Sequence, residues 1–168
     1  MGVDHSTLLS WLADYDKENI TIGVVASHSS LQILHGARVE GFRTLGIAVG
    51  ENRRRFYKAF PGAEPDEWLM LENYREMFDY AEWFREKNVI IVPHGSLVEY
   101  LGSENFRNLE VPTFGNRGIL RWESSRAKQR DWLKAGGCTM PKVLEDPHDI
   151  DGPVIVKYAG AKGGRGYF

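Results

Sequence analysis

Ile20-Thr21-Ile22-Gly23-Val24-Val25-Ala26 is the stretch that decides the fold, because it is apolar almost throughout. Such a strand is typical of a parallel sheet that helices cover on both faces. It runs into the polar turn Ser27-His28-Ser29-Ser30, and apolar residues then recur at helical spacing as far as Gly41, which is suited to ending a helix. Thr44 to Val49 is a second buried strand. Residues 20–49 therefore predict a βαβ crossover and a parallel sheet.

Three further strands extend the predicted sheet. They are expected at Glu67 to Leu71, at Val89 to Val92 and, in a shorter form, at Val111 to Gly115. A helix over Asn73 to Lys87, with Asn73 as its cap, separates the first two of them, and a short helix capped by Ser6 precedes the sheet. This alternation predicts an α/β, doubly wound domain, to which we assign residues 1–118.

The chain changes character after Asn116. Ile119 to Ala135 is predicted as one charged helix closed by Gly136-Gly137, and Lys142 to Leu144 and Pro153 to Tyr158 are predicted strands. These elements open an α+β unit in residues 119–168 that is not finished. We therefore expect the chain to be cut off within its second domain.

A turn rich in glycine and basic residues ends the chain. Lys157 leads through Tyr158-Ala159-Gly160-Ala161 into Lys162-Gly163-Gly164-Arg165-Gly166. Glycine lets backbone N–H groups close on phosphate oxygens, and Lys and Arg supply positive charge. The turn is neither a Walker A box, since no Gly-Lys-Ser/Thr follows, nor a Rossmann fingerprint, since no helix-forming stretch follows. It suggests a flap over ATP, with an ordinary β-hairpin tip as the alternative when the segment is taken alone.

The charge and cysteine content exclude several function classes. The 168 residues carry 21 Lys and Arg against 23 Asp and Glu, a net charge of −2 that gives no general attraction to nucleic acid or anionic membranes. No stretch approaches the ~20 apolar residues of a membrane span. Cys138 is the one cysteine, so no disulfide framework can form, which favours a reducing compartment and hence the cytoplasm.

His28 and Ser96 are the candidate ligand-binding residues of the first domain. Each follows a predicted strand at the carboxyl edge of the sheet, where open α/β sheets bind ligands, among small polar residues such as Ser27 and Ser30 that can bring donors to a phosphate. A solvated loop histidine and a plain helix N-cap are the alternatives. Arg53-Arg54-Arg55 follows the second strand at the same edge and is better explained as a solvated charge run. The sequence shows no nucleophilic triad and no metal-ligand spacing.

Five blocks of the chain carry a family resemblance. They are Ser27-His28-Ser29-Ser30-Leu31-Gln32-Ile33, Pro93-His94-Gly95-Ser96, Tyr100-Leu101-Gly102, Val111-Pro112-Thr113-Phe114-Gly115-Asn116-Arg117 and Leu120-Arg121-Trp122-Glu123-Ser124. Together they resemble the archaeal 5-formaminoimidazole-4-carboxamide ribonucleotide synthetase family of the ATP-grasp superfamily. The resemblance runs from about Ile20 to the last residue, and its stretch from Phe114 to Ser124 is specific.

This resemblance implies a Rossmann-like preATP-grasp domain followed by an ATP-grasp domain, in a ligase that uses ATP, Mg²⁺ and formate. The implied reaction formylates 5-aminoimidazole-4-carboxamide ribonucleotide through formyl phosphate in IMP (purine) biosynthesis. His28 and Ser96 would contact the ribonucleotide, and Lys157 would reach the ATP phosphates. The flexible flap would include Lys162, Gly163, Gly164 and Gly166. The metal ligands of the family belong to a C-terminal half, so this chain is expected to hold no metal.

Ser125-Arg126 departs from the family pattern, because many ATP-grasp proteins have an Asp-Lys pair there, and the roles of Arg126 and Lys128 are left open. Two other functions also stay open: an ATP-grasp ligase that activates another carboxylate, and a truncated ribonucleotide-binding fragment without catalysis. Small-molecule substrates are the expected partners, without nucleic acid or membrane, and a homo-oligomer stays open. The 168-residue chain by itself is expected to be inactive.

Overall fold

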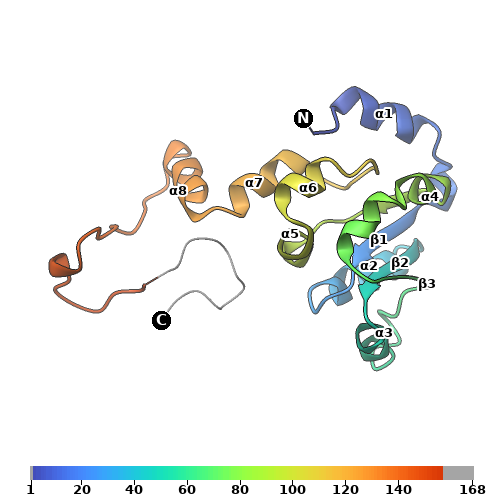
Figure 1. Ribbon diagram of the computed structural model, residues 1–168, viewed down its shortest axis with the longest axis horizontal. Helices are drawn as coiled ribbons and strands as arrows, with labels where there is room; N and C mark the ends of the chain where they lie inside the picture. The colour runs from blue at the N-terminus through green and yellow to red at the C-terminus, as the bar shows by residue number, and fades with distance from the viewer. Residues whose placement is uncertain (1, 157–168) are drawn as a thin grey trace. The chain divides into compact units, whose positions relative to one another are not determined.

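The structure is a computed structural model that describes residues 2–156, and the chain divides into two compact units, Met1–Arg117 and Gly118–Phe168 (Figure 1). Unit 1 holds the sheet, and the described part of unit 2 contains short helices. The residues predicted to contact ATP lie outside the described residues: Lys157, Lys162, Gly163, Gly164 and Gly166.

The sheet of unit 1 is parallel and four-stranded, in the order β3-β2-β1-β4. Its strands are β1 (Thr21–Val25), β2 (Arg43–Val49), β3 (Glu67–Leu71) and β4 (Val89–Ile91). β1 lies in the middle, with Gly23 opposite Leu45 of β2 on one side and opposite Ile91 of β4 on the other. The four predicted strands and the parallel sheet are confirmed. The order is that of a Rossmann-like fold, which confirms the predicted fold class.

The predicted fifth strand is wrong in extent. A single parallel bridge joins Thr113 to Ile91 of β4. Ile91 N–H donates to Pro112 O at 3.0 Å, and Ile91 O accepts from Phe114 N–H at 2.9 Å. The ladder does not grow further because Pro112 has no N–H to donate, and because Gly115 turns the chain away with a φ of +79°.

Helices and 3₁₀ turns connect the strands of unit 1. In chain order they are α1 (His5–Ala13) and η1 (Lys17–Asn19) before β1, α2 (Ser30–Val39) before β2, α3 (Glu51–Tyr57) before β3, η2 (Tyr74–Phe78) and α4 (Ala81–Glu86) before β4, then α5 (Gly95–Leu101) and α6 (Ser103–Arg107). The alternation of strands and helices therefore continues through the unit, and it includes α3, a helix that the apolar pattern did not predict.

Two helix predictions in unit 1 need correction. Asn73 caps the segment before β4 as predicted, in a capping box with Glu76, but the segment is divided into η2 and α4. Tyr80 separates them because its backbone (φ −97°, ψ 9°) leaves the helical region. The first helix is capped by Asp4 rather than Ser6: Asp4 Oδ1 accepts from Thr7 N–H at 2.8 Å, and Ser6 Oγ donates to the same oxygen at 2.7 Å.

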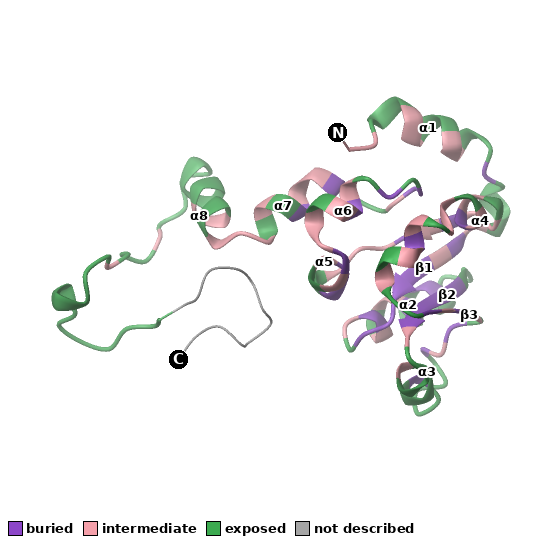
Figure 2. Cartoon of the chain, in the orientation of Figure 1, coloured by how far each residue is buried: buried purple, intermediate pink, exposed green. Residues whose placement is uncertain are grey.

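One face of the sheet packs against α2 and α3. The buried cluster on that face contains Val24 of β1, Ala26 directly after β1, Ala48 of β2, Leu34 of α2 and Tyr57 of α3. Successive strand residues point to opposite faces, so Val25 and Ile47 line the other face, and both are fully buried. Figure 2 shows the buried residues concentrated on the strands. The sheet is therefore the core of unit 1, which leaves its edges for ligands.

Unit 2 begins with helices. The single helix predicted over Ile119 to Ala135 is three elements, η3 (Arg117–Ile119), α7 (Leu120–Glu123) and α8 (Arg126–Ala135). The break falls at Ser125, which is extended (φ −124°, ψ 117°) and whose side chain accepts from Lys128 N–H to cap α8. Gly136-Gly137 ends α8 as predicted, with a φ of +77° at Gly137.

The strands predicted in unit 2 are not formed within the described residues. From Lys142 to Val156 the one regular element is the 3₁₀ turn η4 (Pro147–Asp149). A strand is held by hydrogen bonds to a neighbouring strand, and residues 118–156 contain none. Val143 and Ile155 are accordingly 54% and 70% exposed, although both are strong strand formers.

Candidate functional site

The carboxyl ends of β1 and β4 form the candidate site of unit 1. These strands are neighbours in the sheet. After β1 the chain crosses to β2, on the side of β1 away from β4. After β4 the chain returns to β4 through the bridge between Ile91 and Thr113. A sheet of this kind has its ligand crevice where the strand order reverses, outside the carboxyl ends. The turn after β1 carries His28, and the turn after β4 carries Ser96. The topology therefore brings both predicted residues to one edge.

The turn after β1 is fixed by a buried network of hydroxyl groups. Ser27 N–H donates to Ser30 Oγ at 2.9 Å, and Ser30 Oγ donates to Ser27 O at 2.8 Å. Tyr57 of α3 reaches over from the next crossover, donating its hydroxyl to Ser27 O at 2.7 Å and contacting Ser30 Oγ as well. Ser30 was expected to offer a donor to a phosphate, but its side chain is fully buried and used by the turn. His28 is the exposed side chain that this turn presents.

The turn after β4 is held by His94, which the sequence analysis did not single out. His94 Nε2 lies 2.8 Å from Val25 O, and His94 Nδ1 accepts from Ser96 N–H at 3.3 Å. A carbonyl oxygen can only accept, so Nε2 carries the proton and Nδ1 is free to cap α5. Burial lowers the pKa of His94, the bond to Val25 O opposes that shift, and the nearby His28 lowers it further. His94 is therefore a neutral imidazole that joins the two turns.

Ser96 is not the helix N-cap that was the alternative interpretation of this residue. His94 is the cap of α5, and Ser96 is only 7% exposed. Within residues 2–156 no hydrogen bond uses the Ser96 hydroxyl. A hydroxyl without a protein partner can donate to a ligand or accept from it. The Ser96 hydroxyl is thus without a partner among the described residues, whereas His28 Nε2 lies 3.2 Å from Ser29 Oγ on the exposed surface of its turn.

Arg53 and two stacked tyrosines border the same edge. Arg53 Nη1 donates to Ala26 O, at the end of β1, at 3.2 Å, and Arg53 Cζ lies 5.2 Å from the ring centroid of Tyr100 on α5. Tyr100 is stacked on Tyr74, with 4.8 Å between ring centroids and 9° between planes. Burial raises the pKa of Tyr74, and the charge of Arg53 partly offsets the shift. The edge therefore combines a half-buried cation with an aromatic wall.

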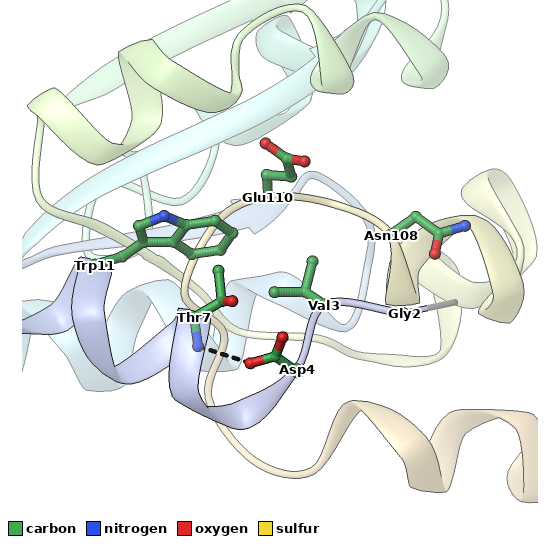
Figure 3. A pocket seen from close by; sticks show the side chains of 7 residues that line it. All are labelled: Gly2, Val3, Asp4, Thr7, Trp11, Asn108 and Glu110. Atoms are coloured by element: carbon green, nitrogen blue, oxygen red, sulfur yellow. Dashed lines mark hydrogen bonds between the residues drawn. The ribbon is translucent and has the colours of Figure 1, made fainter.

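A separate pocket of unit 1 lies between α1 and the segment after α6 (Figure 3). Its volume is about 390 Å³, and its lining is Gly2, Val3, Asp4, Thr7, Trp11, Asn108 and Glu110. The Asp4 carboxylate that faces it already accepts from Thr7 N–H, the bond drawn in Figure 3. None of the predicted site residues lines this pocket.

The described residues contain neither a metal-binding cluster nor a membrane-spanning helix. Within residues 2–156 no group of three or more His, Cys, Asp and Glu side chains could hold a metal ion. Among the helices of the same range, none has the length and apolar character that a membrane crossing requires.

Comparisons with known proteins point to one group. The family described as a protein of unknown function (DUF1246) matches residues 22–144. The chain is 59% identical over 161 residues to a 5-formaminoimidazole-4-carboxamide-1-(beta)-D-ribofuranosyl 5'-monophosphate synthetase of Methanosarcina barkeri, covering 96% of the chain and 45% of that protein. The protein of that name from Archaeoglobus fulgidus is 45% identical and is covered to 46%. The chain thus spans under half the length of these curated relatives.

A solved structure gives the same picture. The crystal structure of an IMP biosynthesis protein PurP from Thermococcus kodakaraensis matches with a TM-score of 0.65 and 34% sequence identity. The match covers 81% of this chain and 43% of that protein. The fold of the described residues is therefore shared with a protein that is more than twice as long as the matched part.

Proposed function

The chain belongs to the family described as a protein of unknown function (DUF1246), and we propose that it forms the ribonucleotide-binding N-terminal part of a formate-dependent ligase of purine biosynthesis. The complete enzyme would formylate 5-aminoimidazole-4-carboxamide ribonucleotide with ATP and formate. The relatives that support this reading carry the product of that reaction in their names. The proposal places the enzyme in the cytoplasm, and the described residues leave its oligomeric state open.

The observation that carries the proposal is the pair of turns at the β1–β4 edge. His28 is exposed on the first turn, and the Ser96 hydroxyl has no partner on the second within the described residues. Their supports are rigid, because the first turn is bonded to Tyr57 and the second to Val25 through His94. Polar groups on oriented supports need not be ordered when the substrate binds, which lowers the entropic cost of positioning it. We assign His28 and Ser96 to ribonucleotide binding.

The chemistry requires activation of formate. Formate is a poor electrophile toward an amine, so a formate oxygen first attacks the γ-phosphorus of ATP and ADP leaves, which gives formyl phosphate. The amine nitrogen of the ribonucleotide then attacks the formyl carbon and loses a proton, and phosphate leaves. Catalysis of this kind rests on placing the reactants in line and on screening the phosphate charge. We assign the second task to Lys157 and to the glycine turn with Lys162, Gly163, Gly164 and Gly166.

The defining test is the substrate dependence of ATP hydrolysis. A protein of the relatives' length that begins with this chain is expected to release ADP only when formate and the ribonucleotide are both present, since a formyl phosphate formed without an acceptor would waste ATP. Release of ADP and formation of the formamido ribonucleotide are measured together by chromatography. Turnover with acetate at the same rate, or none with formate, would contradict the proposal. The 168-residue chain alone is expected to bind the ribonucleotide without turnover.

His28→Ala is expected to weaken ribonucleotide binding by about 1.5–3 kcal/mol, because the variant removes a hydrogen bond to a strongly polar ligand. The melting temperature should barely change, since His28 is an exposed turn residue outside the core. Calorimetric titration gives the affinity, and His35→Ala is the matched control, because His35 is an exposed histidine of α2 that bonds to Gly62. Normal binding by His28→Ala together with a lower melting temperature would assign His28 a structural role instead.

A further inference from the structure

Arg53 stands apart from the other arginines of its run. The run Arg53-Arg54-Arg55 lies in α3, and its members differ in what they touch. Arg54 pairs with Glu51 on the same helix at 3.8 Å, and both Arg54 and Arg55 are exposed. Arg53 is half-buried and turns toward the carboxyl end of β1, where Nη1 donates to Ala26 O at 3.2 Å. The interpretation of the whole run as a solvated charge run is therefore wrong for Arg53.

Neutral groups hold the Arg53 guanidinium in place. Besides the carbonyl of Ala26, its neighbour is the ring of Tyr100, 5.2 Å from Cζ to the centroid. A guanidinium stacked on a ring keeps its edge free, and its five N–H donors form a planar fork. Ala26 directly precedes Ser27 and His28, and Tyr100 follows Ser96 along α5. The cation therefore borders both of the turns that form the candidate site.

The charge of Arg53 has no acidic partner. The ion pairs among residues 2–156 use Arg38, Arg54, Lys87 and Arg107, and none of them includes Arg53. A cation that is partly removed from water without a carboxylate is electrostatically uncompensated, and an anionic ligand supplies the missing charge. Arginine suits a phosphate in particular, because two of its parallel N–H groups match two phosphate oxygens.

We propose that Arg53 binds the phosphate monoester of the ligand at the β1–β4 edge and makes the site select phosphorylated over unphosphorylated ribosides. This rests on the proposed function, because the names of the relatives include a ribofuranosyl 5'-monophosphate. His28 and Ser96 then contact the remainder of the nucleotide. The role is one of binding and specificity, since Arg53 holds the end of the ligand opposite to the reacting base.

The test compares a phosphorylated ligand with its unphosphorylated form. Calorimetric titrations measure the affinity of the protein for 5-aminoimidazole-4-carboxamide ribonucleotide and for the corresponding riboside. Arg53→Met is expected to lose roughly 10- to 100-fold in affinity for the ribonucleotide, the value of one charge-assisted pair, with riboside affinity unchanged. Arg55→Met removes an equal charge from the same helix and should change neither the ribonucleotide affinity nor the riboside affinity. Arg53→Lys, which keeps the charge without the fork, should fall between the wild type and Arg53→Met.

A third ligand, ribose 5-phosphate, separates this inference from the proposed function. If the wild type binds ribose 5-phosphate but no aminoimidazole compound, and Arg53→Met loses that binding, the phosphate role stands and the proposed substrate falls. Equal preference for the ribonucleotide in Arg53→Met and the wild type would overturn the phosphate role alone. Absence of any phosphate preference in the wild type would also overturn it. Melting curves show whether Arg53→Met is folded, and Arg53→Lys serves as the test if it is not.

Discussion

Above pH 10 the protein is expected to lose stability, because Tyr15 and Tyr57 of unit 1 are buried, and Tyr74 is half-buried, as neutral phenols. Burial raises the pKa values of Tyr15, Tyr57 and Tyr74 from the ordinary value of 10.0. Tyr15 is 6% exposed and donates to Val89 O at 2.9 Å, and Tyr57 is fully buried in the network of the β1 turn. In the unfolded chain all three phenols ionise near pH 10, whereas in the folded chain they keep their protons to a higher pH.

The sign of the effect follows from the protons bound in each state. A raised pKa in the folded state means that the stabilisation is complete below pH 10 and is lost as the pH rises toward the folded values. Each phenol that is ionised in the unfolded chain and still protonated in the folded chain adds a slope of about −1.4 kcal/mol per pH unit. Arg117 opposes them, because burial lowers its pKa to about 10 and the unfolded chain keeps that proton longer. Three phenols act against this one guanidinium, so the net effect of a rising pH is a loss of stability.

Urea denaturation between pH 8 and pH 11.5 measures this loss directly. Tyr15→Phe is the informative variant, because it removes one of the three phenols. At pH 8 it should cost about 1 kcal/mol for the lost bond to Val89 O, and its alkaline slope should be shallower by about 1.4 kcal/mol per pH unit. A flat profile up to pH 11.5 in the wild type, or an unchanged slope in Tyr15→Phe, would contradict the assignment of neutral, buried phenols.

The sheet of unit 1 could be predicted from the sequence because burial on both faces leaves a local trace. A strand covered by helices on either side needs apolar residues at every position, so β1 and β2 appear as continuous apolar runs. Once the order of strands and helices is known, the general topology of parallel sheets places the residues after β1 and β4 at one edge. His28 and Ser96 could therefore be singled out without coordinates.

The supports of the site could not be predicted, because they depend on contacts between distant residues. Helix α3 buries only Tyr57, so its sequence lacks the apolar period of an amphipathic helix. The Tyr57 hydroxyl bonds to Ser27 and Ser30, which precede it by 30 and 27 positions in the sequence. His94 bonds to Val25, which precedes it by 69 positions. Histidine is also an uncommon N-cap, so no local feature of the sequence identifies His94 as the residue that caps α5. Arg53 likewise shows its role only through Ala26 and Tyr100.

The strands predicted in unit 2 were wrong for the opposite reason. The local sequence favours strands there, but no strand forms among residues 118–156. Val143 and Ile155 have strong strand preference, and that preference measures how well a side chain fits a pleated surface with neighbours. Within residues 118–156 there is no such surface. The curated relatives are about twice as long as this chain, and we propose that the partner strands of an ATP-grasp domain belong to their remaining length.

Arg117→Met is expected to lower the free energy of unfolding by about 2–4 kcal/mol. Arg117 is 8% exposed, and it ties together the segment that returns to β4. Its Nε donates to Thr113 Oγ1 at 2.9 Å, its Nη1 donates to Leu109 O, and its guanidinium lies 5.5 Å over the ring of Phe106. Arg117 is the last residue of the Phe-Gly-Asn-Arg block, and no local pattern in the sequence indicates this role.

The size of the Arg117 effect depends on two opposed contributions. Removing a buried charge that has no acidic partner is favourable, and the lowered pKa shows that the charge is costly where it is. Against this, Leu109 O and the Thr113 hydroxyl lose their donors while they stay buried or half-buried, and Thr113 forms the bridge to β4. Unsatisfied buried acceptors cost about 1–3 kcal/mol each, so the loss outweighs the gain.

Urea denaturation at pH 7 of Arg117→Met, Arg117→Lys and Arg107→Met decides the balance. Arg107 is the matched control, because it pairs with Glu104 at 3.0 Å on the surface of α6, and an exposed pair of this kind contributes about 0.2–1 kcal/mol. The free energy of unfolding of Arg117→Lys should lie between those of Arg117→Met and Arg107→Met, since an ammonium group reaches one acceptor at a time and lacks the planar fork. If Arg117→Met were as stable as Arg107→Met, the cost of the buried charge would equal the value of its hydrogen bonds, and Arg117 would not hold the return to β4.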